Sequence, residues 1–72
     1  MDTTPILPGT SLTPREQAVL TLVSKGHSNL EVAYHLNISR PTVNSYLKII
    51  FSKLGVDNRV RAARWAWEQG LA

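Results

Sequence analysis

Apolar residues recur at helical spacing in four segments of the chain, separated by short polar turns. In the first segment, Thr13 is followed by Pro14 and then by Glu16, which predicts a capping box with proline in the first helical turn. Gly26 stops this pattern. The apolar stripe of the segment consists of Val19, Leu22 and Val23. The sequence therefore predicts a helix that begins after Thr13 and ends before Gly26.

A second capping box, formed by Ser28 and Glu31, opens a shorter segment. Its inward residues are predicted to be Val32, Ala33 and Leu36. Asn37 follows, and asparagine tolerates the left-handed backbone conformation better than most residues do. We therefore expect a short helix that ends in a sharp turn.

The third segment is the longest, and a helix is predicted from the capping residue Ser39 to Leu54, with Gly55 as its stop. At about 100° per residue, one face is apolar and is expected to be buried. It comprises Val43, Leu47, Ile50 and Leu54, with Tyr46 and Phe51 on its flanks. The opposite face carries Asn44, Ser45, Lys48, Ile49 and Ser52.

This outward face offers amide, ammonium and hydroxyl groups and one aliphatic side chain, the groups that read base edges in a major groove. An ordinary solvated helix face, which needs no ligand, is the alternative. A short helix, a tight turn and a longer helix form the helix-turn-helix arrangement. Helix N-termini at Ser28 and Ser39 would also offer N–H groups to phosphates. The arrangement favours DNA recognition.

The fourth segment follows Asn58 and predicts a helix from about Arg59 to Gln69, ended by Gly70. No segment shows the alternation of a strand. The predicted fold is therefore all-α, with four helices in a helix-turn-helix domain.

Trp65 and Trp67 cannot both face the core from this fourth helix. Trp67 groups with Val60, Ala63 and Ala66, and is predicted to be packed inside. Trp65 falls among polar residues, which favours a dimer or interdomain contact. A ring that lies flat on its own domain is the alternative. The residues of this expected interface are Arg61, Trp65 and Glu68.

With 72 residues, the chain is long enough for one small domain. We expect residues 1–11, which contain two prolines and a glycine, to be a flexible tether, and residues 12–72 to form the domain. There is no cysteine, which excludes disulfides and thiolate metal sites. No apolar run approaches the about 20 residues of a membrane span. These features predict a cytoplasmic, nucleoid-associated protein.

Basic residues are concentrated in the second half of the chain. The net charge is +3 and the sequence pI is about 9.8. Residues 40–72 carry six basic side chains against two acidic ones, a balance of +4, whereas residues 1–39 have a balance of −1. This distribution suits a polyanionic partner.

No set of residues predicts catalysis or a bound metal. There is no Ser/His/Asp set, no pair of carboxylates in a cleft and no Gly-rich phosphate loop. His27 and His35 lack a third ligand nearby. We therefore expect no enzyme activity, no metal and no cofactor. Glu16 is expected to cap its helix and to pair with an arginine such as Arg59.

Five motifs together resemble the LuxR-type helix-turn-helix domain, the effector domain of NarL/FixJ response regulators. They are LTPRE at residues 12–16, G-x-S-N-x-E at 26–31, IS-x-x-TV at 38–43, KLGV at 53–56, and R-x-x-A in the fourth helix. The resemblance covers residues 12–71. It implies the DNA-binding domain of a bacterial transcriptional regulator, which dimerises on paired half-sites, commonly through the fourth helix.

Carried over by position, the resemblance implies roles for particular residues. The base-reading residues would be Asn44, Ser45 and Lys48, and Ile49 could touch a thymine methyl. Contacts to the DNA backbone would come from Ser28, Asn29, Ser39, Arg40, Thr42, Tyr46 and Lys53. The chain departs from the common pattern at Leu30, Pro41 and Asn44, where lysine is frequent, and at Tyr46, where histidine is usual. Fewer cations predict a shallower salt dependence of DNA binding.

The resemblance leaves the biological context open. One possibility is an effector domain linked to an N-terminal receiver that takes up a phosphoryl group, with RNA polymerase as a further partner. A stand-alone small regulator is the alternative. A different class of function is a protein-interaction module that dimerises with a related regulator and inhibits it without binding DNA. Region four of a sigma factor also shares LTPRE, but KLGV followed by a fourth helix argues against it.

Overall fold

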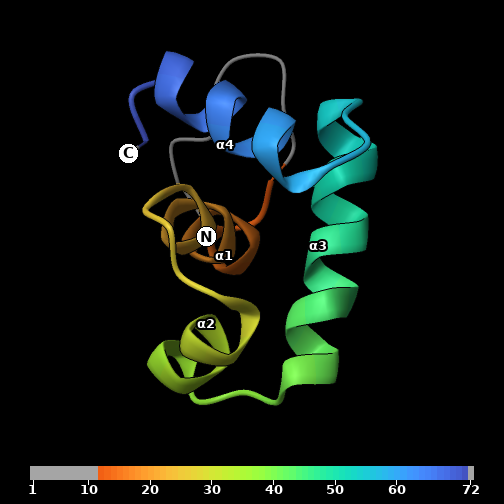
Figure 1. Ribbon diagram of the computed structural model, residues 1–72. Coiled ribbons are helices and arrows are strands. Elements are labelled where there is room, and N and C mark those ends of the chain that lie inside the picture. Colours follow the sequence, from red (N-terminus) through yellow and green to blue (C-terminus); the bar gives the residue numbers. More distant parts are fainter. Residues whose placement is uncertain (1–11, 72) are drawn as a thin grey trace.

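The computed structural model describes residues 12–71, which form four helices and no strand. The helices are α1 (Pro14–Ser24), α2 (Asn29–Leu36), α3 (Arg40–Leu54) and α4 (Arg59–Glu68). In Figure 1, α3 runs along one side of the molecule, with α2 near its first turn and α4 near its last. The predicted all-α fold is confirmed. The predicted tether, residues 1–11, lies outside the described residues.

The helix ends follow the local signals in the sequence. The Thr13 hydroxyl accepts the Glu16 backbone N–H at 3.1 Å, and the Glu16 carboxylate accepts the Thr13 N–H at 2.9 Å. Ser28 and Glu31 form the same box at the start of α2. Asn37 and Gly55 adopt the left-handed conformation, with φ of 58° and 71°. The predicted caps and turns are confirmed, so α2 and α3 meet at a tight turn.

The core lies where α1 meets the other three helices. Its fully or nearly fully buried residues are Leu12, Val19, Leu20, Val23, Val32, Ala33, Val43, Leu47, Ile50, Ala62 and Ala66. The apolar face predicted for α3 is the one that is buried, with Tyr46, Phe51 and Leu54 partly covered at its edges. Because this face is held against α1 and α2, the opposite face of α3 is directed to solvent.

The helix predicted after Asn58 is confirmed, but the prediction that Trp67 packs inside with Val60 was wrong, because Trp67 is 58% exposed and Val60 is 72% exposed. The helix instead faces α1 through Ala62 and Ala66, which are completely buried. Two alanines allow close approach of the helices and leave no room for an indole between them. Trp67 lies at the edge of this contact, where its Nε1–H donates to the Ser24 carbonyl at 3.1 Å.

The partner predicted for Glu16 was also wrong. Glu16 is 5% exposed, and its carboxylate accepts a hydrogen bond from Lys53 Nζ at 2.8 Å, so that α1 is tied to the last turn of α3. Burial alone would raise the pKa of the Glu16 carboxyl. The Lys53 hydrogen bond, the Thr13 N–H and the Lys53 charge outweigh burial, and the pKa lies below the ordinary value of 4.5.

This lowered pKa predicts an acid-sensitive contact between α1 and α3. A lowered pKa in the folded state stabilises the fold above pH 4.5, and this stabilisation is lost as the pH falls through the lower folded value. We expect Glu16→Gln to reduce the midpoint of thermal unfolding at pH 7 and to flatten its decline toward pH 3. Glu68→Gln, an exposed change on α4, is the matched control. Equal acid sensitivity of wild type and Glu16→Gln would contradict this account.

Candidate nucleic-acid interface

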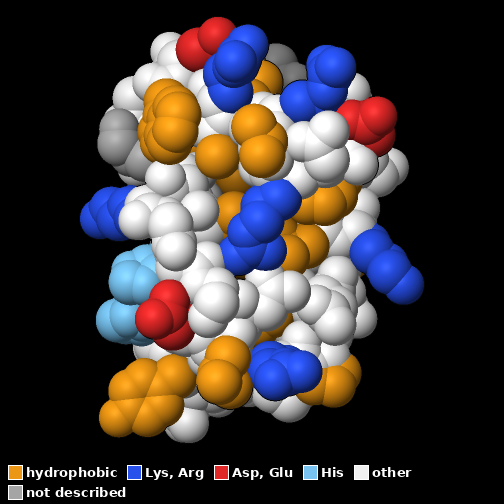
Figure 2. All heavy atoms as spheres, in the orientation of Figure 1, with side chains coloured by type: hydrophobic (Ala, Val, Ile, Leu, Met, Phe, Trp, Pro, Cys, Tyr) orange, Lys and Arg blue, Asp and Glu red, His pale blue; other side chains and the backbone are white. Residues whose placement is uncertain are grey.

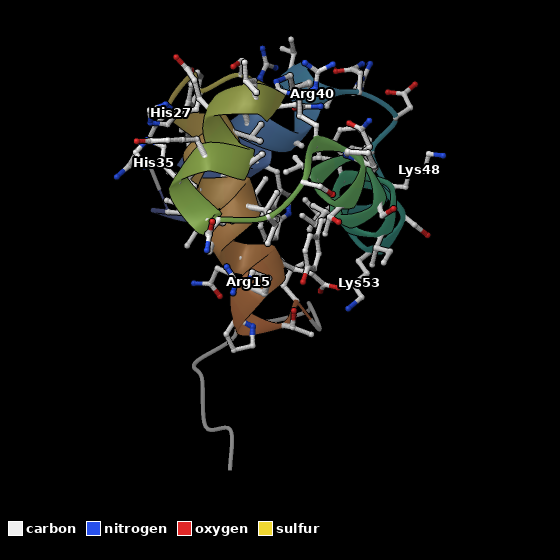
Figure 3. All side chains as sticks on the ribbon, turned by 90° about the horizontal axis from the view of Figure 1, so that it is seen from below. Arg15, His27, His35, Arg40, Lys48 and Lys53 are labelled. Carbon is white, nitrogen blue, oxygen red and sulfur yellow. The ribbon has the colours of Figure 1, made fainter. Side chains whose placement is uncertain are left out.

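The N-terminal turn of α3 is built by its capping residue, Ser39. The Ser39 hydroxyl accepts the Thr42 backbone N–H at 3.2 Å and lies 2.8 Å from the Thr42 hydroxyl. Arg40 is the first residue of the helix and is exposed. Figure 3 shows Arg40 at the α2 end of α3, with its side chain directed away from the core. The first turn of α3 thus presents a cation and hydroxyl groups to solvent.

Four residues predicted to read bases share the outward face of α3. Asn44, Ser45, Lys48 and Ile49 are all exposed, and Ile49 retains 45% of its surface although it is aliphatic. Figure 3 shows Lys48 extending from α3 away from the rest of the molecule. The structure therefore brings these four residues together on one exposed face of α3.

The charge of this region is positive. The sequence of α3 contains Arg40, Lys48 and Lys53 and no acidic residue. Figure 2 shows Lys and Arg side chains spread over the visible face from the α4 end to the α2 end. Lys53 differs from the other two because it forms the ion pair with Glu16. Arg40, Lys48 and Lys53 are all exposed, so the α3 surface is electrostatically favourable for a polyanion.

The start of α2 adjoins the outward face of α3. The Ser28 N–H donates to the Glu31 carboxylate at 2.8 Å, and this bond is the main cause that places the pKa of Glu31 below its ordinary value. Asn29 lies beside Asn44, and its Nδ2 donates to Asn44 Oδ1 at 2.7 Å. One residue predicted to bind the DNA backbone is therefore bonded to one predicted to read bases.

Sequence reasoning missed the role of Arg59, the first residue of α4. Its guanidinium donates to Asn29 Oδ1 and to the His27 carbonyl, both at 2.6 Å. It thereby ties α4 to the start of α2. Arg59 lies 30 positions from Asn29 and 32 from His27, so no local pattern could indicate these contacts.

Tyr46 is partly buried at the edge of the core, and only part of its side chain is accessible from the α3 surface.

His27 and His35 lie together beside α2, with ring centroids 4.8 Å apart (Figure 3). Within residues 12–71, no three side chains of His, Cys, Asp or Glu gather as metal ligands would. In the same range, no helix is long and apolar enough to cross a membrane.

A second surface, the α4 groove, lies at the opposite end of α3 from the α2–α3 turn (Figure 1). It is lined by Val56, Asn58, Val60, Arg61, Arg64, Trp65 and Glu68. The three residues predicted for an interface, Arg61, Trp65 and Glu68, therefore share one groove. Trp65 is half-buried because part of its ring packs against the core. The exposed ion pair of Arg61 with Asp57, at 3.4 Å, borders the groove.

Comparison with known protein families identifies the family to which this helix-turn-helix arrangement belongs. Residues 10–66 match the family described as bacterial regulatory proteins, luxR family. The chain belongs to the luxR family. Together with the observed α2–turn–α3 geometry, the match shows that the chain contains a luxR-type helix-turn-helix DNA-binding domain.

Relatives of this luxR-type domain are bacterial regulators. The response regulator Rre1 of Synechocystis is 42% identical over 69 residues, which are 96% of this chain and 30% of that protein. The transcriptional regulatory protein DesR of Bacillus subtilis is 42% identical over 59 residues, 82% of this chain and 30% of that protein. The probable transcriptional regulatory protein SgaR of Hyphomicrobium methylovorum is 46% identical over 52 residues, 72% of this chain and 25% of that protein. The chain thus spans less than a third of the length of these relatives.

Proposed function

We propose that this luxR-type domain binds duplex DNA sequence-specifically, as a dimer, with α3 in the major groove. The observation that carries the proposal is the outward face of α3, where Asn44, Ser45, Lys48 and Ile49 are exposed on a helix without acidic residues. A helix of 15 residues is about 22 Å long, and the major groove, about 12 Å wide, admits an α-helix.

The two kinds of DNA contact come from different parts of this surface. The four outward residues of α3 would meet base edges, because they are exposed on the face opposite the buried one. Phosphates would be held at the helix starts by Ser28, Asn29, Ser39, Arg40 and Thr42, and at the flanks of α3 by Tyr46 and Lys53. Lys53 would have to serve a phosphate while it is paired with Glu16, so its contribution is expected to be the smallest of the cations.

The regulatory context follows from the relatives and from the α4 groove. Since several relatives are named response regulators, we infer that the domain is the effector part of a two-component regulator. A receiver domain and RNA polymerase would be its protein partners in the cytoplasm. The α4 groove would pair two protomers, because it combines an indole with charges of both signs and lies away from the DNA-reading face.

The test of this function is selection of bound sequences from a random duplex library with this luxR-type domain, whose four helices share one buried core. The expected result is a motif with two related half-sites. Failure to enrich any motif at moderate salt would contradict direct readout. It would favour the interaction module, which inhibits a related regulator without binding DNA.

If two protomers pair through the α4 groove, changes in this groove should affect DNA binding differently from changes in α3. We expect Trp65→Ala to lower the affinity for a paired site about 10²-fold and to leave the affinity for a single half-site unchanged, because only the gain from joint binding is lost. Val60→Glu is a second variant, since Val60 lines the groove and is 72% exposed, so the fold should tolerate it. Titrations of single and paired half-sites measure the effect. Equal losses on both duplexes, or no loss in either variant, would contradict dimerisation through α4.

A further inference from the structure

A hydrogen-bonded series of side chains, from Arg59 through Asn29, holds Asn44 on the outward face of α3. Arg59 Nη1 donates to Asn29 Oδ1 at 2.6 Å, and Asn29 Nδ2 donates to Asn44 Oδ1 at 2.7 Å. The other terminal nitrogen of the guanidinium, Nη2, donates to the His27 carbonyl at 2.6 Å, and this bond holds the Arg59 side chain in place. Arg59 and Asn29 are partly buried, whereas Asn44 is exposed.

The direction of both hydrogen bonds in this series is set by Arg59. A guanidinium carries donors and no acceptor. Asn29 must therefore turn its amide oxygen toward Arg59, which leaves its nitrogen for Asn44. Asn44 must in turn offer its oxygen to Asn29. The NH₂ group of Asn44 thus keeps both of its donors for a ligand, whereas its oxygen is already engaged on one side by Asn29.

We propose that Arg59 and Asn29 orient the Asn44 amide so that it presents hydrogen-bond donors to the groove and selects a base edge with an acceptor. Arg59 and Asn29 are then positioning residues for base recognition, and Asn29 acts on more than the DNA backbone. The inference rests on the proposed role of Asn44 in reading DNA.

The chemistry of the base edges turns this orientation into a preference. In the major groove guanine presents the acceptors N7 and O6, thymine presents the acceptor O4, cytosine presents the N4 donor, and adenine presents the acceptor N7 beside the N6 donor. The bidentate pairing of asparagine with adenine uses both the amide oxygen and the amide nitrogen. In Asn44 the oxygen already accepts from Asn29. Guanine or thymine is therefore expected at the contacted position and cytosine is disfavoured, while adenine, which presents both an acceptor and a donor, is expected to rank between them.

The sharpest test is Asn29→Asp, which keeps the shape of the side chain and makes both of its terminal atoms acceptors. Arg59 can still pair with the carboxylate, but Asn44 must now donate its NH₂ to Asp and present its oxygen to the groove. The preference should then invert toward the donors of cytosine N4 and adenine N6. An acidic residue also suits the first turn of α2, so the helix is expected to persist.

The readout is the base preference at one position, defined as the position whose preference disappears in Asn44→Ala. Four duplexes that differ only at this base pair are compared in competition at low salt, because the new carboxylate weakens all DNA binding. We expect wild type to favour guanine or thymine over cytosine roughly fivefold to tenfold. Asn29→Asp is expected to reverse this ratio, and Asn29→Ala to bring it close to one.

The matched control is Arg40→Ala, an exposed change at the start of α3 outside this chain of hydrogen bonds. It should weaken binding to all four duplexes equally. An unchanged preference in both Asn29 variants, a wild-type preference for cytosine, or no position that depends on Asn44 would overturn the inference while the motif remains. Absence of any wild-type motif would instead contradict the proposed function, and the inference would fall with it.

Discussion

Replacing Asn44 and Lys48 together by alanine is expected to lower the affinity for the selected operator about 10²- to 10³-fold. Each good base contact discriminates by about 1–3 kcal/mol, and both side chains are exposed on the outward face of α3. Binding to unrelated DNA should fall much less, because the phosphate contacts at the helix starts remain. The measurement is the dissociation constant for the operator and for a scrambled duplex at one salt concentration.

The control for lost charge is Lys25→Ala. Lys25 is exposed at the C-terminal cap of α1, outside the α2–turn–α3 surface, and its removal changes the net charge by the same amount. It should reduce both affinities only slightly and by the same factor. If the double variant still preferred the operator over the scrambled duplex as strongly as wild type does, the outward face of α3 would not be the reader.

Ile50→Ala is expected to have the largest effect on folding. Ile50 is completely buried in the core, and removal of its side chain should cost about 2–5 kcal/mol of unfolding free energy. Small domains are stable by only about 5–15 kcal/mol in total, and this one lies near the lower size limit. We expect the midpoint of thermal unfolding to fall by roughly 10 °C or more, measured by circular dichroism.

Ile49→Ala is the matched control, because it is the same substitution one position earlier on the same helix. Ile49 is 45% exposed, so its loss should cost less than about 1 kcal/mol. Its effect is expected on DNA preference, at a base pair with a thymine methyl. Similar losses of stability in the two variants would contradict the division of α3 into a buried face and a reading face.

The helices could be predicted from the sequence because their ends are determined locally. Ser28, Ser39, Asn37 and Gly55 cap or stop helices through contacts within a few residues, and each does so in the structure. The buried face of α3 was also predictable, since large aliphatic residues recur at helical spacing along one side.

The orientation of α4 could not be predicted from hydrophobicity alone. Its largest apolar residues, Trp65 and Trp67, are not the ones that face α1; the small residues Ala62 and Ala66 are. Which face packs depends on how closely two helices approach, and that distance is set by the whole core. Trp67 shows the consequence, since its ring stays exposed while its N–H bonds to the end of α1.

The candidate site, like the fold, could be predicted from the sequence only in part. The exposure of Asn44, Ser45 and Lys48 followed from the period of α3. The partners of the polar residues did not, because Glu16 meets Lys53 across 37 positions and Asn29 meets Arg59 across 30. Such pairings form only in the assembled fold. They determine which end of the Asn44 amide, and which cations of α3, would be available to contact DNA.

The central claim, that the α2 start and the outward face of α3 contact DNA, is tested most directly by nuclear magnetic resonance. The ¹⁵N-labelled domain is titrated with a duplex that carries one selected half-site, so that pairing through α4 does not contribute. The account predicts that the largest shifts occur at residues 28–29 and 40–49, with small shifts in α4. Shifts centred on α1 or α4, with α3 unaffected at saturation, would contradict it.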